Sequence, residues 1–129
     1  MILFATTTSA VAQNSDETVV ANGTWTKKFA RSRGEWSIVE RNGQRFVILN
    51  DDFRTRGAPD LKIFLTPMDV STVDNDNATK GSVFIAELSS KSGAQEYLIL
   101  KEVDLTNFKS IIIHCEAYSK LWSAAALRQ

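Results

Sequence analysis

The sequence predicts an all-β fold, a single-domain antiparallel β-sandwich or partly closed barrel of about seven to nine short strands. Three observations predict it. Short apolar segments alternate with polar residues as half-buried strands do, turn residues separate them at roughly 10-residue spacing, and 129 residues suffice for one ordinary domain. We expect the sandwich domain at residues 21–129, after a flexible N-terminal arm at residues 1–20.

The strongest local signal is a hairpin centred on Asn42-Gly43, the pair best suited to a type I′ turn because both of its central residues take positive φ. Strands are expected on either side, at residues 34–41 and 44–50. A two-residue loop fixes the register, so that Glu40 faces Arg45 as an opposite-charge pair. The side chains expected to share one apolar face are Trp36, Ile38, Val47 and Leu49.

The rest of the chain continues the strand pattern. The further predicted strands are 61–65, 83–88, 96–100, 110–115 and 124–128. Gly, Pro, Ser and Asp residues fill the breaks between them, as turn chemistry requires. One helical turn is expected at residues 104–108, and the polar segment 70–81 is expected to be a surface loop.

Charge is balanced overall but divided along the chain. Fifteen basic and fifteen acidic residues give a formal net charge of zero, which argues against a nucleic-acid binder because such a protein needs excess positive charge. Residues 27–56 carry eight basic groups against four acids, whereas residues 57–107 carry eight acids against four lysines. Such a division either orients a charged partner or forms two solvated faces.

The first residues resemble the end of an export signal. They are small and apolar, and Ala10-Val11-Ala12 has the A-x-A pattern that signal peptidase accepts. We interpret residues 1–20 as a signal-peptide remnant and arm, which places the protein outside the cytoplasm (periplasmic, secreted or at the cell surface). A weakly paired N-terminal arm is the alternative. No apolar run approaches the ~20 residues that cross a bilayer.

Few residues offer site chemistry. One cysteine cannot form an internal disulfide, and one histidine cannot build a multi-histidine metal site, so no metal centre is predicted. His114 and Cys115 are neighbours in a strand, so they point to opposite faces and cannot share a ligand without a bulge. No acid–base or nucleophile constellation is present, which favours a non-enzymatic role. Cation binding by Asp51, Asp52 or the loop 74–77 stays open, although Ala78 replaces the fifth calcium ligand.

Several ordered motifs resemble a known family. Asp52-Phe53 leads into Gly57-Ala58-Pro59-Asp60 and then a strand, and the run Ser110 to Tyr118 holds a strand with a cysteine near its end. This order, from about Gly34 to Leu127, is similar to the Skeletor-type electron-transfer domain, the "DM-thirteen" family. In this corner we expect Gly57 to take positive φ, Pro59 to fix the turn and the Asp60 carboxylate to accept backbone N–H bonds.

The resemblance implies a β-rich domain outside the cytoplasm that exchanges electrons with a partner protein. The strand cysteine of the family maps to Cys115, either as a bare redox thiol or as a ligand to a prosthetic group such as haem. His114 stands where the family often has Trp, where it would supply a ligand or a proton donor or be simply an exposed substitution. The alternative function is a non-catalytic binding module without a redox role, for which Trp25, Trp122 and Tyr118 are the candidate exposed aromatics.

Overall fold

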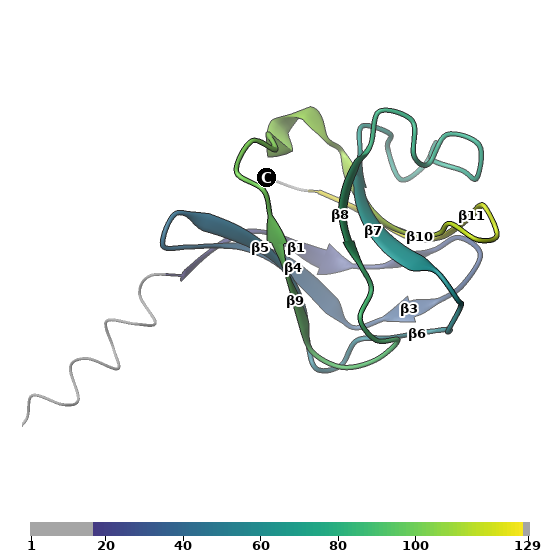
Figure 1. The fold of residues 1–129 in the computed structure, drawn as a ribbon, viewed down its shortest axis with the longest axis horizontal. Coiled ribbons are helices and arrows are strands. Elements are labelled where there is room, and N and C mark those ends of the chain that lie inside the picture. The colour runs from purple at the N-terminus through teal and green to yellow at the C-terminus, as the bar shows by residue number, and fades with distance from the viewer. Residues whose placement is uncertain (1–16, 128–129) are drawn as a thin grey trace, which may run out of the picture.

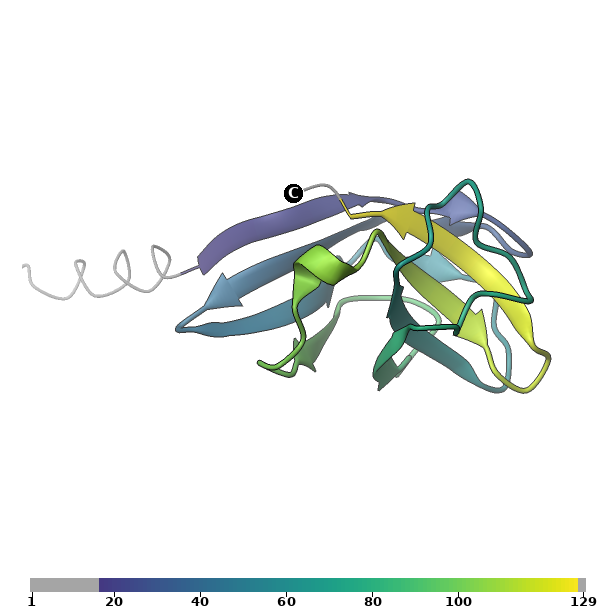
Figure 2. The same cartoon turned by 90° about the horizontal axis from the view of Figure 1, so that it is seen from above.

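The computed structural model describes residues 17–127, and within them the chain forms two stacked antiparallel sheets (Figures 1 and 2). The first sheet has the order β1-β4-β5-β9, with β1 at Glu17–Thr24, β4 at Glu35–Arg41, β5 at Gln44–Leu49 and β9 at Gln95–Ile99. The second has the order β2-β11-β10-β7-β8, with β2 at Thr26–Lys27, β11 at Lys120–Ala126, β10 at Ser110–Cys115, β7 at Leu61–Thr66 and β8 at Val83–Glu87. A two-stranded ribbon joins β3 (Ser32–Arg33) to β6 (Arg54–Thr55).

The all-β sandwich prediction is confirmed, and the described residues hold eleven strands. The excess comes mainly from β2, β3 and β6, two-residue strands too short to show a periodic pattern. β1 begins at Glu17, so residues 17–20 of the expected arm lie in a strand paired with β4. The rest of the expected signal segment, residues 1–16, lies outside the described residues.

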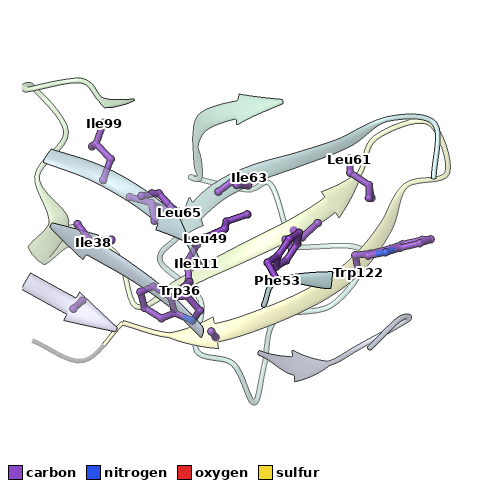
Figure 3. Close-up of a cluster of buried hydrophobic side chains, with 14 of the residues drawn as sticks. Trp36, Ile38, Leu49, Phe53, Leu61, Ile63, Leu65, Ile99, Ile111 and Trp122 are labelled. Carbon is purple, nitrogen blue, oxygen red and sulfur yellow. The ribbon is translucent and has the colours of Figure 1, made fainter. Parts of the chain in front are cut away.

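The main core lies between the two sheets (Figure 3). Trp36, Ile38, Val47 and Leu49 have no exposed surface, which confirms the predicted apolar face of the hairpin. Against them pack the inward residues of the second sheet, among them Ile63, Leu65, Ile111 and Ile113. Burial at roughly 25 cal/mol per Å2 of apolar surface is the main force that holds the sheets together.

A second apolar cluster covers the outer face of the second sheet. Phe64, Ile112, Leu121 and Ala124 lie beneath Val73 and Ala78 of the loop 70–81. The loop is therefore more than the expected polar surface segment, because its apolar residues cover the outer face of β10 while the main core covers the inner face. Its polar side chains hold it in place: Asp74 Oδ1 accepts the backbone N–H groups of residues 76 and 77, and Asn75 Oδ1 accepts that of Leu121.

The hairpin has the predicted turn and register. Asn42 and Gly43 have φ of 54° and 80°, and Glu40 pairs with Arg45 as Trp36 does with Leu49. The expected ion pair does not form, since Arg45 Nη2 instead donates to the carbonyl oxygens of residues 100, 101 and 103. Those carbonyls follow the end of β9, and one guanidinium donates to all three of them, whereas an exposed carboxylate would offer Arg45 a solvated partner.

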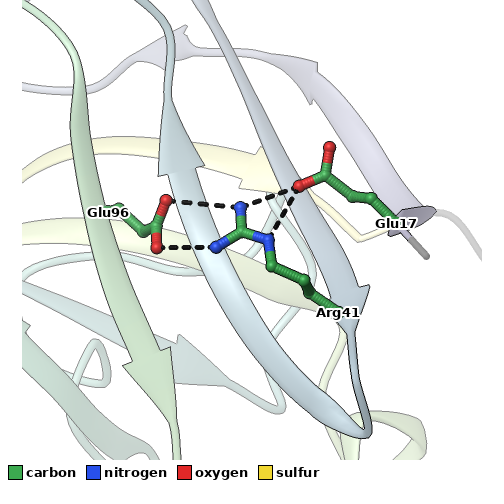
Figure 4. Close-up of polar contacts among 3 residues, drawn as sticks. All are labelled: Glu17, Arg41 and Glu96. Atoms are coloured by element: carbon green, nitrogen blue, oxygen red, sulfur yellow. Dashed lines mark hydrogen bonds and ion pairs between the residues drawn. The ribbon is translucent and has the colours of Figure 1, made fainter. Parts of the chain in front are cut away.

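An exposed arginine links the strands of the first sheet (Figure 4). Arg41 Nη2 lies 2.7 Å from Glu17 Oε2, and Arg41 Nη1 lies 3.0 Å from Glu96 Oε2. The hydrogen bonds with Glu96, then those with Glu17, raise the pKa of Arg41. The arginine is charged at any ordinary pH in any case, so the trio orients the start of β1 and contributes little stability at this solvated position.

A single turn of 3-10 helix, η1 at Leu105–Asn107, confirms the one predicted helical segment. Asp104 is its N-cap, and Asp104 Oδ1 accepts hydrogen bonds from Thr106 Oγ1 at 2.7 Å and from Thr106 N at 3.0 Å. These bonds, the side-chain one first, lower the pKa of Asp104. The stabilisation is therefore full above the unfolded-state pKa of about 3.9 and is lost as pH falls through the folded value.

Asp104→Asn is accordingly expected to lower the melting temperature slightly at neutral pH and not at all at the acid limit. Thermal unfolding of both chains between neutral pH and pH ~2 measures the difference. Asp51→Asn, which removes the same charge from an exposed carboxylate, controls for net charge. A difference that stays constant down to the acid limit would contradict the assignment of the cap.

Candidate functional site

Cys115 is the last residue of β10, and its side chain points into the main core. Its backbone pairs with Leu61 on β7 and with Lys120 on β11. The residue has 0% exposure and is packed within the core cluster that also contains Leu61 and Trp122. The strand end therefore has a paired strand on each side, and apolar side chains of the core surround the thiol.

His114 points to the opposite face, as the strand alternation predicts, and at 5% exposure it is not an exposed substitution. Its ring lies 6.1 Å from that of Phe64 in an edge-on contact, and its Nδ1 lies 2.9 Å from Glu116 Oε2. The register shift between β10 and β11 leaves Trp122 as the extra residue on β11, so it re-aims neither side chain of β10. His114 and Cys115 therefore cannot ligate one ion together.

The Gly57–Asp60 corner is fastened to the strand that carries Cys115. The Asp60 carbonyl oxygen accepts from Glu116 N at 3.0 Å, immediately after the cysteine. The Asp60 carboxylate lies 3.5 Å from Lys62 Nζ, so the side chain forms an ion pair where backbone N–H bonds were expected. Gly57 is not among the residues of positive φ, which corrects that expectation. A Cβ there would meet Lys91 Cδ at 3.3 Å, so the glycine admits the lysine stem.

The upstream motif residues have structural positions. Phe53 is 1% exposed and packs edge-on to Trp25, with ring centroids 6.5 Å apart. Asp52 Oδ1 accepts from Glu35 N at 3.4 Å. Both residues help to fix the turn after β5, which leads to β6 and the corner. The motif that suggested the family is thus mainly a scaffold around the strand end.

A surface hollow of about 280 Å3 lies over this corner and is lined by residues 57–61 and 87–91. Leu61 belongs both to its lining and to the strand position paired with Cys115. The hollow thus reaches the strand position paired with the cysteine. Neither Cys115 nor His114 lines it.

The site does not fit a haem bound through Cys115. An axial thiolate needs open space beside sulfur for the iron and the macrocycle, but Cys115 has no exposed surface and is surrounded by packed core residues. Within residues 17–127, no group of three or more His, Cys, Asp or Glu side chains is arranged to hold a metal ion.

The three candidate aromatics do not form a shared platform. Trp122 is 2% exposed and donates its indole N–H to the Arg56 carbonyl oxygen at 3.0 Å. Trp25 is half-buried against Trp36 and Phe53, whereas Tyr118 is 56% exposed. Of the three, Tyr118 alone faces solvent.

These features define a small antiparallel β-sandwich domain with a single thiol sealed at the end of a central strand. The chain belongs to the Electron transfer DM13 family, whose model matches residues 25–127. No curated protein and no solved structure shows significant similarity to it. The family match supports a general role in electron transfer. Between residues 17 and 127 the structure contains no helix with the length and hydropathy needed to cross a membrane.

Proposed function

We propose that this chain is an electron-transfer domain that works outside the cytoplasm, and that Cys115 is its redox group. The family match over residues 25–127 supports the class of function, and Cys115 is the one thiol in the sequence. The location is supported by the A-x-A pattern at Ala10-Val11-Ala12. Unpaired thiols are uncommon in oxidising compartments unless they react or are well buried.

The chemistry is thiol–disulfide exchange with a partner protein. The Cys115 thiolate attacks one sulfur of the partner's disulfide, and the other sulfur leaves as a thiolate. An external thiolate then attacks Cys115 Sγ in this mixed disulfide, so that the partner leaves fully reduced and Cys115 is left in a disulfide with the external thiol. A second external thiolate attacks the external sulfur of that disulfide, which releases the Cys115 thiolate and forms an external disulfide, so two electrons have passed from two external thiols to the partner's disulfide. Because the sequence has one cysteine, each electron pair must pass through such an intermolecular bond.

Access to the sulfur requires a local opening, since Cys115 is buried in the closed structure. The strand end is followed by residues 116–119, a turn whose side chains are all exposed. Ser119 has φ of 52°, a left-handed conformation that residues other than Gly, Asn and Asp rarely adopt. Exposed turns with few buried contacts open at lower free energy than the whole domain. In this proposal the turn opens and uncovers Sγ while the sandwich stays folded.

We therefore expect Cys115 to react with a disulfide reagent faster than the domain unfolds globally. The measurement compares the labelling rate in native buffer with the unfolding rate extrapolated from denaturant. Cys115→Ser removes the thiol and must abolish labelling. Labelling that occurs only at the global unfolding rate would rule out the local opening and, with it, the exchange mechanism.

A turn variant sharpens this test. Ser119→Gly relieves the positive-φ strain, so it is expected to slow labelling several-fold by stabilising the closed turn. Asn42→Gly makes the matched change at φ of 54° in the hairpin turn between β4 and β5, away from Cys115. It is expected to leave the labelling rate unchanged. Equal effects of the two variants would mean that labelling follows overall stability.

A further inference from the structure

Five basic side chains surround a second, larger hollow on the surface. It has a volume of about 430 Å3 and is lined by Arg31, Arg33, Arg54, Thr55, Arg56, Gly57 and Lys91. Four of its cations come from the basic segment 27–56 noted in the sequence, and Lys91 joins them from the acidic segment. The lining contains no carboxylate and no large apolar side chain. The fold has therefore concentrated one sign of charge in a chain whose net charge is zero.

The ribbon of β3 and β6 brings the cations together (Figure 1). Arg33 and Arg54 are directly opposite partners in this antiparallel pair. Like charges at directly opposite positions destabilise a strand pair. The stability of the ribbon therefore does not explain why two arginines are paired here. Lys91 is held beside them because its carbonyl oxygen accepts from Thr55 N at 2.8 Å.

The positive charges of the hollow are not neutralised within residues 17–127. None of its five basic side chains forms an ion pair with an acid of the described chain, and all five are exposed. Arg56 does lie over the Phe29 ring, 5.8 Å from its centroid, which orients the guanidinium without removing its charge. The donors of the hollow are therefore available to a ligand.

Buried hydroxyl groups anchor the ribbon that carries the arginines of the hollow. Ser32 Oγ lies 2.8 Å from Thr55 Oγ1 and 2.6 Å from Ser123 Oγ, and Ser123 Oγ donates to the Ala30 carbonyl oxygen at 3.0 Å. Ser32, Thr55 and Ser123 are all buried, so this hydroxyl chain fixes the ribbon to β11. Backbone fixed in this way presents the arginines at set positions, which lowers the entropy that binding must overcome.

We propose that this hollow binds a compact, multiply charged oxyanion of the phosphate class. Guanidinium groups form paired N–H···O bonds with phosphate, and four of the five cations are arginines. The lining offers charge and hydrogen-bond donors but no apolar wall for a ring or an alkyl chain. A short pyrophosphate-like anion therefore suits it better than a larger organic ligand. The site is independent of Cys115 and of the proposed exchange chemistry.

Titration calorimetry with inorganic pyrophosphate tests the proposal on the native chain. Binding is expected to weaken as salt is added, because exposed charges are screened. Arg33→Gln/Arg54→Gln is expected to weaken it at least tenfold. Lys80→Gln/Lys101→Gln removes the same net charge from exposed lysines outside the hollow and is expected to change affinity less than twofold. Pyrophosphate should also raise the melting temperature of the native chain and not that of the arginine variant.

The outcomes separate the alternatives. Absence of pyrophosphate binding at low salt would overturn the proposal. An equal loss of affinity in the two double variants would also overturn it, because binding would then follow the net charge of the chain rather than the hollow. A hexaglutamate peptide provides the other arm. If the peptide binds at the arginines and pyrophosphate does not, the hollow is a docking surface for an acidic protein segment and the oxyanion site is refuted. Arg54→Gln should by itself leave the fold intact or raise its melting temperature, because it relieves the opposed charges.

Discussion

Replacing Trp36 by alanine is expected to lower the free energy of unfolding by about 3–5 kcal/mol, the range for large aromatic residues in a packed core. Trp36 has no exposed surface and lies between the two sheets. A Cβ built on Gly23 would meet its ring at 3.2 Å, and the ring of Trp25 is 6.2 Å away. The neighbouring backbone is held by strand pairing, so it cannot collapse into the cavity. Urea unfolding followed by far-ultraviolet circular dichroism measures the loss.

The companion variant is Trp36→Phe. Its smaller ring leaves a smaller cavity, and it also removes an indole N–H that is buried with no hydrogen-bond partner among residues 17–127. Its destabilisation is therefore expected to be less than half that of the alanine variant. An alanine variant that loses under 1 kcal/mol would contradict the assignment of Trp36 as a tightly packed core residue.

Gly34→Ala is the second substitution with a large expected effect, about 2–4 kcal/mol of destabilisation. Gly34 has φ of 91°, which strains any L-residue, and a Cβ there would lie 2.8 Å from the Asp52 backbone carbon and oxygen. Backbone atoms cannot rotate away as a side chain can. Either β3 or the turn that holds Asp52 and Phe53 must shift.

Gly43→Ala is the matched control for this effect. Gly43 has φ of 80°, but a Cβ there would meet nothing within 4 Å. It therefore carries the conformational strain without the clash, and the difference between the two variants in denaturant unfolding isolates the close approach. Equal losses of unfolding free energy in the two variants would show that the backbone around Asp52 moves away from the added Cβ at little cost. Because Arg33 precedes Gly34, the Gly34 variant should also weaken pyrophosphate binding, whereas the Gly43 variant should not.

The fold was predictable wherever the determinants are local. The Asn42-Gly43 turn fixes its own φ values and therefore the register of β4 and β5, which the structure confirms. The same sequence reasoning failed for Arg45, whose partners are carbonyl groups of a segment 55 or more positions away. β11 begins at Lys120, four positions before the predicted start, because an extra residue at Trp122 breaks the alternation that marks a strand.

The candidate site was predictable in part. The strand alternation correctly placed His114 and Cys115 on opposite faces, but burial of the thiol depends on which side chains the other sheet supplies. The basic hollow had a signal in the sequence, the excess of arginine and lysine in residues 27–56. Its assembly depends on a two-residue ribbon and on Lys91, which no short-range pattern reveals.

The buried hydroxyl chain also sets an order on biosynthesis. It joins Ser32 to Ser123 across 91 positions. A ribosome releases the N-terminal arginines long before it releases the serine that fixes their ribbon. Contacts so distant in sequence form late, after the costly closure of a long loop. The proposed anion site therefore cannot be completed before Ser123 has left the ribosome, and a chain threaded unfolded through a membrane would complete it only after Ser123 had crossed.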